Sequence, residues 1–122
     1  MTVTDWPDVA QHLSAELRNL RGGASDVMKG FSAIAQSALA PGALDVKTKE
    51  LIALAISVAT RCDDCIAFHA KAAVERGATR EELLETLGMA IYMGAGPSVM
   101  YASHALGAFN QFAEAAKKTA AA

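Results

Sequence analysis

The sequence predicts an all-helical fold, and three observations carry that prediction. Alanine, leucine and methionine are plentiful whereas prolines and aromatic residues are few, and alanine and straight-chain residues lose the least entropy on entering a helix. Apolar residues recur with helical spacing along the chain. Glycines, prolines and capping residues divide it into about six helical segments, with no long linker and no repeat between them. We therefore expect one domain that spans residues 1–122.

The first three helices are delimited by glycine, proline and polar residues. The first expected helix, Asp5–Leu20, carries one apolar stripe and ends at Gly22-Gly23. The second, Ser25–Leu39, starts at a serine that can cap its N-terminus and stops before the Pro41-Gly42 break. The third, about Asp45–Thr60, opens with polar residues and then becomes almost wholly apolar. That pattern is typical of a central, buried helix.

The last three helices have clearer boundary signals. The fourth, about Cys62–Gly77, has acids in its first turn, where the helix dipole favours them, and ends at a glycine. The fifth opens with the capping box Thr79–Glu82 and ends at Gly94–Gly96. Pro97 suits the first turn of the sixth helix, which we expect over Ser98–Lys117.

Composition also limits the partners and the compartment. The formal net charge of −2 gives no reason to expect nucleic acid or an anionic membrane as partner. The longest apolar run, Leu51–Ala59, is about half the length of a membrane-spanning helix, and residues 1–6 lack the pattern of a signal peptide. We expect a cytoplasmic protein, where two cysteines are more often catalytic or metal-binding than structural. The high apolar content of so short a chain predicts a homo-oligomer.

The stretch from Cys62 to His69 carries the strongest chemical signal. Cys62 and Cys65 form a C-x-x-C pair at a helix start, where the dipole and the free N–H groups stabilise a thiolate. Such a pair can close a disulfide within one turn. His69 follows Cys65 by four residues and Cys62 by seven, so all three side chains share one helix face. A histidine there can accept a thiol proton or hydrogen-bond the thiolate.

Glu50 lies on the preceding helix, twelve residues before Cys62. If the two helices form a hairpin that turns near Arg61, Glu50 falls within about one turn of the level of His69. Its carboxylate could then orient the imidazole, directly or through water. The sequence therefore predicts an acid–histidine–thiol relay of the general triad type.

Other interpretations of these residues stay open. Structural zinc would need a fourth ligand, which neither a second C-x-x-C nor a histidine pair supplies, whereas a three-ligand metal site remains an alternative. The cysteines could be buried and inert, with a satisfied histidine beside them. Glu50 taken alone could be a solvated acid of the first turns of its helix. We expect His104 and Tyr101, on the sixth helix, to be packing or interface residues rather than ligands.

Four stretches together resemble a known family. They are Lys47–Ala55, which includes Glu50; Cys62-x-x-Cys65-x-x-x-His69; Gly77–Glu82; and Met93–Tyr101. The combined pattern is similar to the carboxymuconolactone decarboxylase family and matches its AhpD-like alkylhydroperoxidase branch most closely. The resemblance covers roughly Leu44 to Phe112, which is most of the chain.

The resemblance implies an all-helical fold that assembles as a trimer or hexamer and reduces peroxides through thiols. It implies that Cys65 attacks the peroxide, that Cys62 resolves the sulfenic acid as a disulfide, and that His69 and Glu50 relay protons. It also implies a dithiol electron donor of the dihydrolipoamide type and no bound cofactor. The best-known members carry a histidine directly before the second cysteine, where this chain has Asp64. An acid beside the thiol disfavours the thiolate.

The expected function is therefore reduction of hydrogen peroxide or small organic hydroperoxides by a peroxiredoxin-type enzyme. One alternative is a lactone decarboxylase or related acid–base enzyme that uses Glu50 and His69. The branch that performs this chemistry lacks the cysteine pair, as the resemblance has it, so the fit is poor. The other alternative is a non-enzymatic redox-sensing module that uses the same disulfide to alter a partner.

Overall fold

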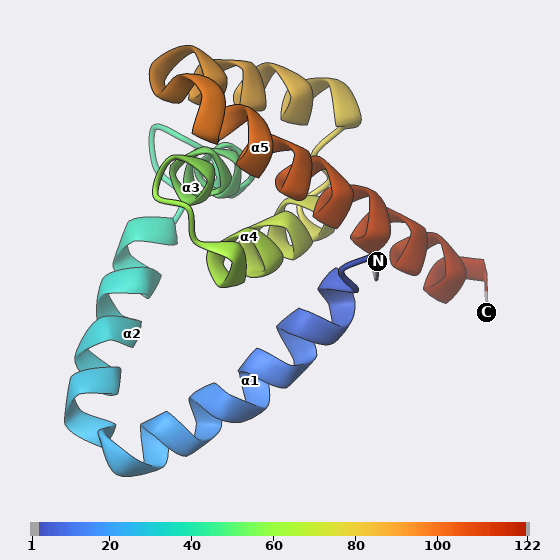
Figure 1. Cartoon of the computed structure of the whole chain (residues 1–122). Coiled ribbons are helices and arrows are strands. Elements are labelled where there is room, and N and C mark those ends of the chain that lie inside the picture. The colour runs from blue at the N-terminus through green and yellow to red at the C-terminus, as the bar shows by residue number, and fades with distance from the viewer. Residues whose placement is uncertain (1–2, 122) are drawn as a thin grey trace.

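A computed structural model describes residues 3–121 of the chain, and this part is built from helices with no strand. Five helices are assigned, namely α1 (Trp6–Gly23), α2 (Ser25–Leu39), α3 (Val46–Ala59), α4 (Asp63–Glu75) and α5 (Arg80–Ala121). Helices α3, α4 and α5 pack together, whereas α1 and α2 form a V-shaped extension beside them (Figure 1). The all-helical prediction is confirmed.

Helix α5 accounts for the difference between the six helices expected and the five assigned. It is interrupted at Ala95, whose φ of 54° and ψ of −139° are not helical. The chain reverses direction there, so the two halves of α5 lie as separate segments (Figure 1). Gly94 permits the close approach at the reversal, because a Cβ at this position would lie 1.9 Å from the Ser98 Oγ. The predicted break is therefore present as a kink that joins the fifth and sixth predicted helices.

The core lies between α3, α4 and both halves of α5. Its largest fully buried side chains are Leu54, Val58, Ile66 and Leu83. The expectation that the whole third helix is buried is wrong in part, because the opposite face of α3 is exposed to solvent. Ile56 on that face is 56% exposed. The apolar run predicts burial correctly only for the face of α3 that meets α4 and α5.

The start of the chain is fixed on the second half of α5. The Trp6 N–H donates to the Gln111 Oε1 at 2.7 Å, and the Gln111 Nε2 donates to the Thr4 carbonyl at 2.9 Å. The Trp6 side chain is buried in the core, and Ala10 follows it one turn later. These contacts attach α1 to the body of the molecule. By contrast, α2 has no buried residue.

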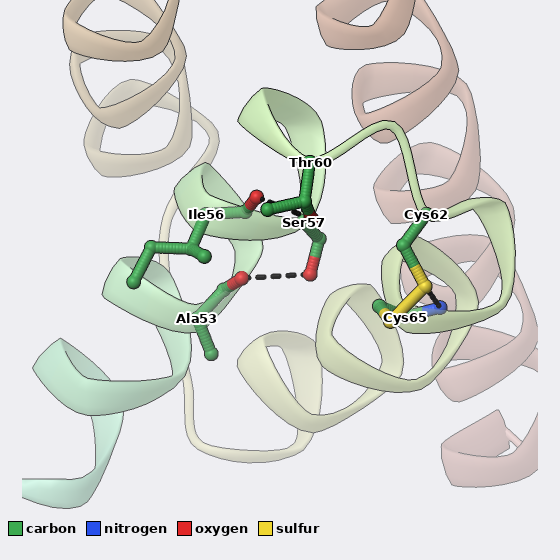
Figure 2. The surroundings of a disulfide bond; sticks show 6 residues. All are labelled: Ala53, Ile56, Ser57, Thr60, Cys62 and Cys65. Carbon is green, nitrogen blue, oxygen red and sulfur yellow. Dashed lines mark hydrogen bonds between the residues drawn. A yellow bond between two sulfur atoms is a disulfide. The ribbon is translucent and has the colours of Figure 1, made fainter.

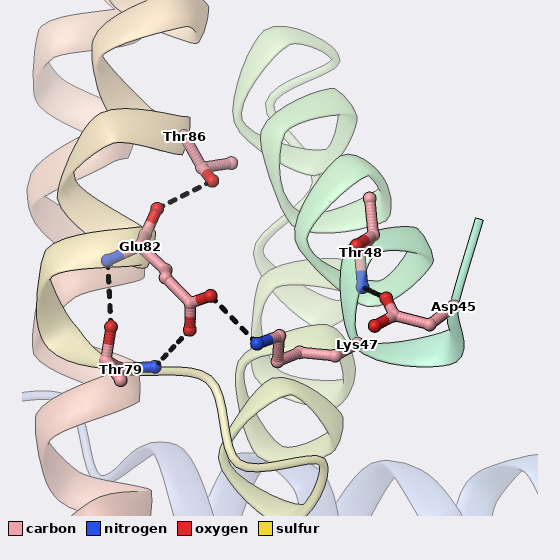
Figure 3. Close-up of polar contacts among 6 residues, drawn as sticks. All are labelled: Asp45, Lys47, Thr48, Thr79, Glu82 and Thr86. Atoms are coloured by element: carbon pink, nitrogen blue, oxygen red, sulfur yellow. Dashed lines mark hydrogen bonds and ion pairs between the residues drawn. The ribbon is translucent and has the colours of Figure 1, made fainter.

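Local capping explains most helix boundaries. Asp45 caps α3 by accepting the Thr48 N–H at 2.8 Å, and Thr79 and Glu82 form the predicted capping box with bonds of 2.8 and 3.1 Å (Figure 3). The Lys47 Nζ lies 2.8 Å from the Glu82 Oε2 and so joins α3 to α5. This ion pair lowers the pKa of Glu82 and raises the pKa of Lys47.

The boundary between the first two helices differs from the prediction. Gly22 and Gly23 lie within the last turn of α1, and Ser25 is the first residue of α2 rather than its N-cap. Ala24 occupies the cap position between the helices, and its N–H donates to the Leu20 carbonyl at 2.8 Å. Because the Ala24 backbone alone makes the turn, the serine hydroxyl is not needed as a cap.

Candidate redox site

A tight turn places the two cysteines at the end of the α3–α4 hairpin. Thr60 caps α3, Arg61 takes a left-handed conformation with a φ of 57°, and Cys62 caps α4. The Cys62 N–H donates back to the Ser57 carbonyl at 3.0 Å. A non-glycine residue in the left-handed region is uncommon and costs free energy. The hairpin turn is therefore fixed by backbone hydrogen bonds rather than by glycine.

The Cys62 and Cys65 sulfurs are joined in a disulfide within the first turn of α4 (Figure 2). The Cys62 Sγ also accepts the Cys65 N–H at 3.2 Å, so a sulfur occupies the place of an N-cap oxygen. Both cysteines are partly exposed. The bond can therefore be reached from solvent, and the N–H groups of the first turn are available to a thiolate when it opens.

Glu50 and His69 form the polar contact that the hairpin geometry predicts. The His69 Nδ1 lies 2.8 Å from the Glu50 Oε1, although 19 residues separate the two in sequence. The Glu50 residue is only 6% exposed, whereas His69 is half-buried. Because a carboxylate can only accept, the hydrogen-bond network assigns the proton to Nδ1. The His69 Nε2 is then left as the free nitrogen that can exchange protons.

The two halves of the site share one face of α4. Cys65 and His69 are four residues apart on this helix, which places their side chains one above the other. Glu50 approaches the same level from α3. The structure thus joins Cys62 to Cys65 and Glu50 to His69, on adjacent turns of one hairpin.

Two hydroxyl groups beside the disulfide are bound to the backbone. The Ser57 Oγ donates to the Ala53 carbonyl at 2.7 Å, and the Thr60 Oγ1 donates to the Ile56 carbonyl at 2.9 Å (Figure 2). Both bonds run back along α3 by one turn, which is the usual arrangement of a helical serine or threonine. Both hydroxyl groups therefore already donate to backbone carbonyls of α3, and we assign these side chains a structural role.

A second histidine, on α5, contacts one of the two acids between the cysteines. The His104 Nδ1 lies 3.2 Å from the Asp63 Oδ1, and its ring packs against Tyr101 and Trp6 with centroid separations of 5.0 and 6.1 Å. Sequence reasoning assigns His104 to packing and misses the contact with Asp63. Because 41 residues separate the two, no local spacing rule could have paired them.

Within residues 3–121, no three His, Cys, Asp or Glu side chains are grouped so as to hold a metal ion. Over that same part of the chain, no helix has the length and apolar character needed to span a bilayer.

Comparison with known proteins gives consistent matches. The profile of the carboxymuconolactone decarboxylase family matches residues 25–108. An uncharacterised protein of Cupriavidus necator is 46% identical over 83 residues, which are 68% of this chain and 74% of that protein. A protein of the cox locus of Paracoccus denitrificans is 40% identical over 91 residues, or 75% of this chain and 81% of that one.

Two crystal structures share the fold over most of the chain. A carboxymuconolactone decarboxylase family protein from Legionella pneumophila has a TM-score of 0.86 and 52% identity, over 88% of this chain and 96% of that one. A protein of the same family from Thermotoga maritima, with a suggested part in the antioxidative response, has a TM-score of 0.82 and 33% identity. That alignment covers 90% of this chain and 94% of the Thermotoga protein.

Proposed function

The chain belongs to the carboxymuconolactone decarboxylase family, and from this premise we propose that it is a thiol-dependent peroxidase of the AhpD-like branch. The observation that carries the proposal is the Cys62–Cys65 disulfide on the helix that also bears the Glu50-bound His69. A redox-active pair beside a proton carrier is what reduction of a hydroperoxide requires. The substrate class is hydrogen peroxide and small organic hydroperoxides.

The first step oxidises Cys65. His69 takes the Cys65 proton on its Nε2, and the thiolate attacks the terminal oxygen of the hydroperoxide. A sulfur–oxygen bond forms and the oxygen–oxygen bond breaks, which leaves Cys65 as a sulfenic acid. The leaving alkoxide takes the proton from His69 and departs as the alcohol, or as water from hydrogen peroxide. Glu50 holds the imidazole through Nδ1 and balances its transient positive charge.

The second step closes the disulfide. The Cys62 thiolate attacks the Cys65 sulfur, the sulfur–oxygen bond breaks, and the departing hydroxide takes a proton to become water. A dithiol donor of the dihydrolipoamide type then supplies two electrons, reopens the bond and becomes a disulfide itself. These steps need no bound cofactor.

The position of His69 supports Cys65 as the peroxide-reactive cysteine. Cys65 is one turn from His69, whereas Cys62 is almost two turns away. The helix start alone would favour Cys62, because the earliest position feels the dipole and the free N–H groups most strongly. We give more weight to the proton acceptor, since removal of the thiol proton must precede attack.

We also propose that the protein acts as a homo-oligomer, trimeric or hexameric, with α2 at a subunit contact. Val27, Phe31 and Ile34 form one face of α2 and are 74%, 62% and 65% exposed. Two methionines of the first half of α5, Met89 and Met93, are also largely exposed. Monomeric proteins rarely leave so many large apolar side chains in water.

The total surface supports the same assembly. The chain exposes 7846 Å², whereas a monomeric protein of 12.7 kDa exposes about 6,200 Å² by the scaling of area with mass. The excess of about 1,600 Å² per chain is about twice the roughly 800 Å² that each partner buries in a standard interface, and it falls in the range of obligate oligomers. We propose that the whole chain, residues 1–122, is one domain of this assembly and that it acts in the cytoplasm, where reduced dithiols are available.

Peroxide consumption driven by dihydrolipoamide tests the proposed function. The wild-type protein should turn over hydrogen peroxide or an organic hydroperoxide, and Cys65→Ser should reduce the rate to that without protein. A decarboxylase that uses Glu50 and His69 would keep its activity after both cysteines are replaced. A redox sensor would show no peroxide turnover but a partner affinity that changes on oxidation. Either result would reject the peroxidase proposal.

A further inference from the structure

The first turn of α4 holds two acids between the redox cysteines, and only one of them has a partner. Asp63 contacts His104, whereas Asp64 makes no ion pair or side-chain hydrogen bond with the residues at positions 3–121. We propose that His104 is a positioning residue for Cys62, because its N–H, donated to Asp63, offsets part of the charge of the carboxylate next to that cysteine and so sustains the Cys62 thiolate. The role of His104 at the resolving step rests on the proposed function, whereas the alkylation experiment that tests it does not.

The geometry places the pair directly beside Cys62. Asp63 is the first residue of α4 and follows Cys62, the N-cap, without an intervening residue. The His104 Nδ1 lies 3.2 Å from the Asp63 Oδ1. Since the carboxylate can only accept, Nδ1 carries the proton.

The His104 ring is held in place by aromatic neighbours, which distinguishes it from a loose surface pair. It packs against Tyr101 of α5 and against Trp6 of α1, with planes tilted by 58° and 44°. Trp6 is itself buried and anchored to Gln111. The side chains of His104 and Asp63 are 43% and 54% exposed, and exposed ion pairs are weak because water and salt screen them and because two mobile side chains must be ordered. Here one partner is already ordered by packing, and Asp63 is the charged group that α4 presents to it.

The charge of Asp63 matters at the resolving step. In that step the Cys62 thiolate attacks the Cys65 sulfenic acid, and the protonated thiol does not react. A full negative charge one residue from Cys62 would lower its thiolate fraction. A slow resolving step would also leave the sulfenic acid open to further, irreversible oxidation by a second peroxide. Pairing Asp63 therefore speeds closure of the disulfide, while the helix start supplies the N–H groups.

The test measures Cys62 without any peroxide. In the Cys65→Ser protein Cys62 is the remaining thiol, and its rate of alkylation by iodoacetamide is followed across neutral and mildly alkaline pH. Replacing His104→Phe keeps an aromatic ring between Tyr101 and Trp6 but removes the donor. We expect alkylation at neutral pH to slow by about threefold, since the hydrogen bond offsets only part of a charge that water already screens, with the pH midpoint of alkylation moved upward.

Two further variants separate charge from packing. Asp63→Asn should restore the alkylation rate in the His104→Phe protein, because the charge that needs a partner is gone. Asp64→Asn is the matched control, and its effect should be the same with and without His104→Phe. If His104→Phe does not fold, His104→Leu, which also lacks a donor, should slow alkylation by the same factor.

Two results would overturn the proposal. One is an unchanged alkylation rate after His104→Phe or, where that variant does not fold, after His104→Leu. The other is a loss that Asp63→Asn fails to restore, which would mean that His104 acts by packing alone. Because the alkylation experiment contains no peroxide, its result does not depend on whether the wild-type protein has peroxidase activity. Equally, failure of this inference would leave the proposed peroxidase function standing.

Discussion

The α1–α2 and α3–α4 hairpins use similar helices in opposite ways. In α3–α4 the apolar faces are buried, and a buried carboxylate, Glu50, finds a histidine on the neighbouring helix. In α1–α2 the second helix has an apolar face of the same spacing but buries none of it. The chain itself covers the apolar faces of the α3–α4 hairpin, whereas the apolar face of α2 requires the surface of another molecule to cover it. We infer that the chemistry is contained in one subunit and that α2 serves assembly.

The largest expected effect separates the hairpins by function. Cys65→Ser should lower peroxide turnover to the background rate, because the thiolate that attacks the peroxide is gone. Phe31→Glu, a change in α2, should leave a measurable rate per chain. Both rates are obtained from the dihydrolipoamide-driven assay. Equal loss of activity in the two variants would mean that the site is not contained in one subunit.

The next effect concerns the Glu50–His69 contact. His69→Ala and Glu50→Gln should each slow the reaction with peroxide by about 10²-fold, the usual contribution of a positioned acid–base group. His69→Ala should also lower the free energy of unfolding by about 3 kcal/mol, because it leaves the buried Glu50 charge without a partner. Stopped-flow peroxide kinetics and urea denaturation measure the two effects.

The exposed histidine of α1 provides the control for that pair. His12 lies 3.9 Å from Glu16, with both side chains largely in solvent, so His12→Ala should change neither quantity appreciably. Similar losses in His12→Ala and His69→Ala would show that the Glu50–His69 contact contributes no more than an exposed pair does.

The apolar face of α2 is tested by a charge placed within it. Phe31→Glu should weaken the assembly by about 30-fold or more in dissociation constant, as expected for loss of a central apolar contact. Gln36→Glu adds the same charge to the opposite face of α2 and should have little effect. Light scattering at micromolar concentration gives the mass of each variant. A wild-type protein that is monomeric under these conditions would contradict the proposed assembly.

Much of this division between the hairpins could be predicted from the sequence. Local signals located Asp45, Thr79 and Glu82 at helix starts, and helical periodicity placed Glu50 near His69. These features depend on spacing within one hairpin or one helix turn. They are therefore encoded over short stretches of chain.

The features that could not be predicted depend on packing between distant segments. The His104–Asp63 contact joins residues 41 apart, and the Lys47–Glu82 pair joins α3 to α5. The exposed face of α3 has the same cause, since an apolar run does not say how many neighbours will cover it. The turn at Ala24 also differs from the prediction, because Gly22 and Gly23 continue α1 for one more turn rather than end it.

A smaller effect is expected at the kink of α5, which positions Tyr101 and His104 over the α3–α4 site. Ala95 has a φ of 54° and a ψ of −139°, a region that glycine tolerates far better than alanine. Ala95→Gly should therefore raise the free energy of unfolding by about 1 kcal/mol, through relief of strain. The same change at Ala115, an exposed position in the regular part of α5, should instead lower the free energy of unfolding by about 1 kcal/mol. Thermal unfolding of both variants decides the matter.

The smallest effect is a pH dependence at the contact between α3 and α5. The Lys47 ammonium beside Glu82 lowers the pKa of that carboxyl. The pair therefore stabilises the fold above the usual pKa of a glutamate, and this stabilisation is lost as the pH falls through the lowered value. Lys47→Met should reduce the unfolding temperature slightly at neutral pH and not in acid. A difference that persists unchanged in acid would rule out the ion pair as its cause.

The central claim is that Cys65, served by His69 and Glu50, is the cysteine that reacts with peroxide. A sulfenic-acid probe applied to the two single-cysteine proteins after one equivalent of peroxide, with mass spectrometry as the readout, tests it most directly. We predict that Cys62→Ser is labelled at Cys65, because no thiol remains to resolve the sulfenic acid, and that Cys65→Ser is not labelled. Labelling of Cys65→Ser and not of Cys62→Ser would contradict the account and reverse the roles of the two cysteines.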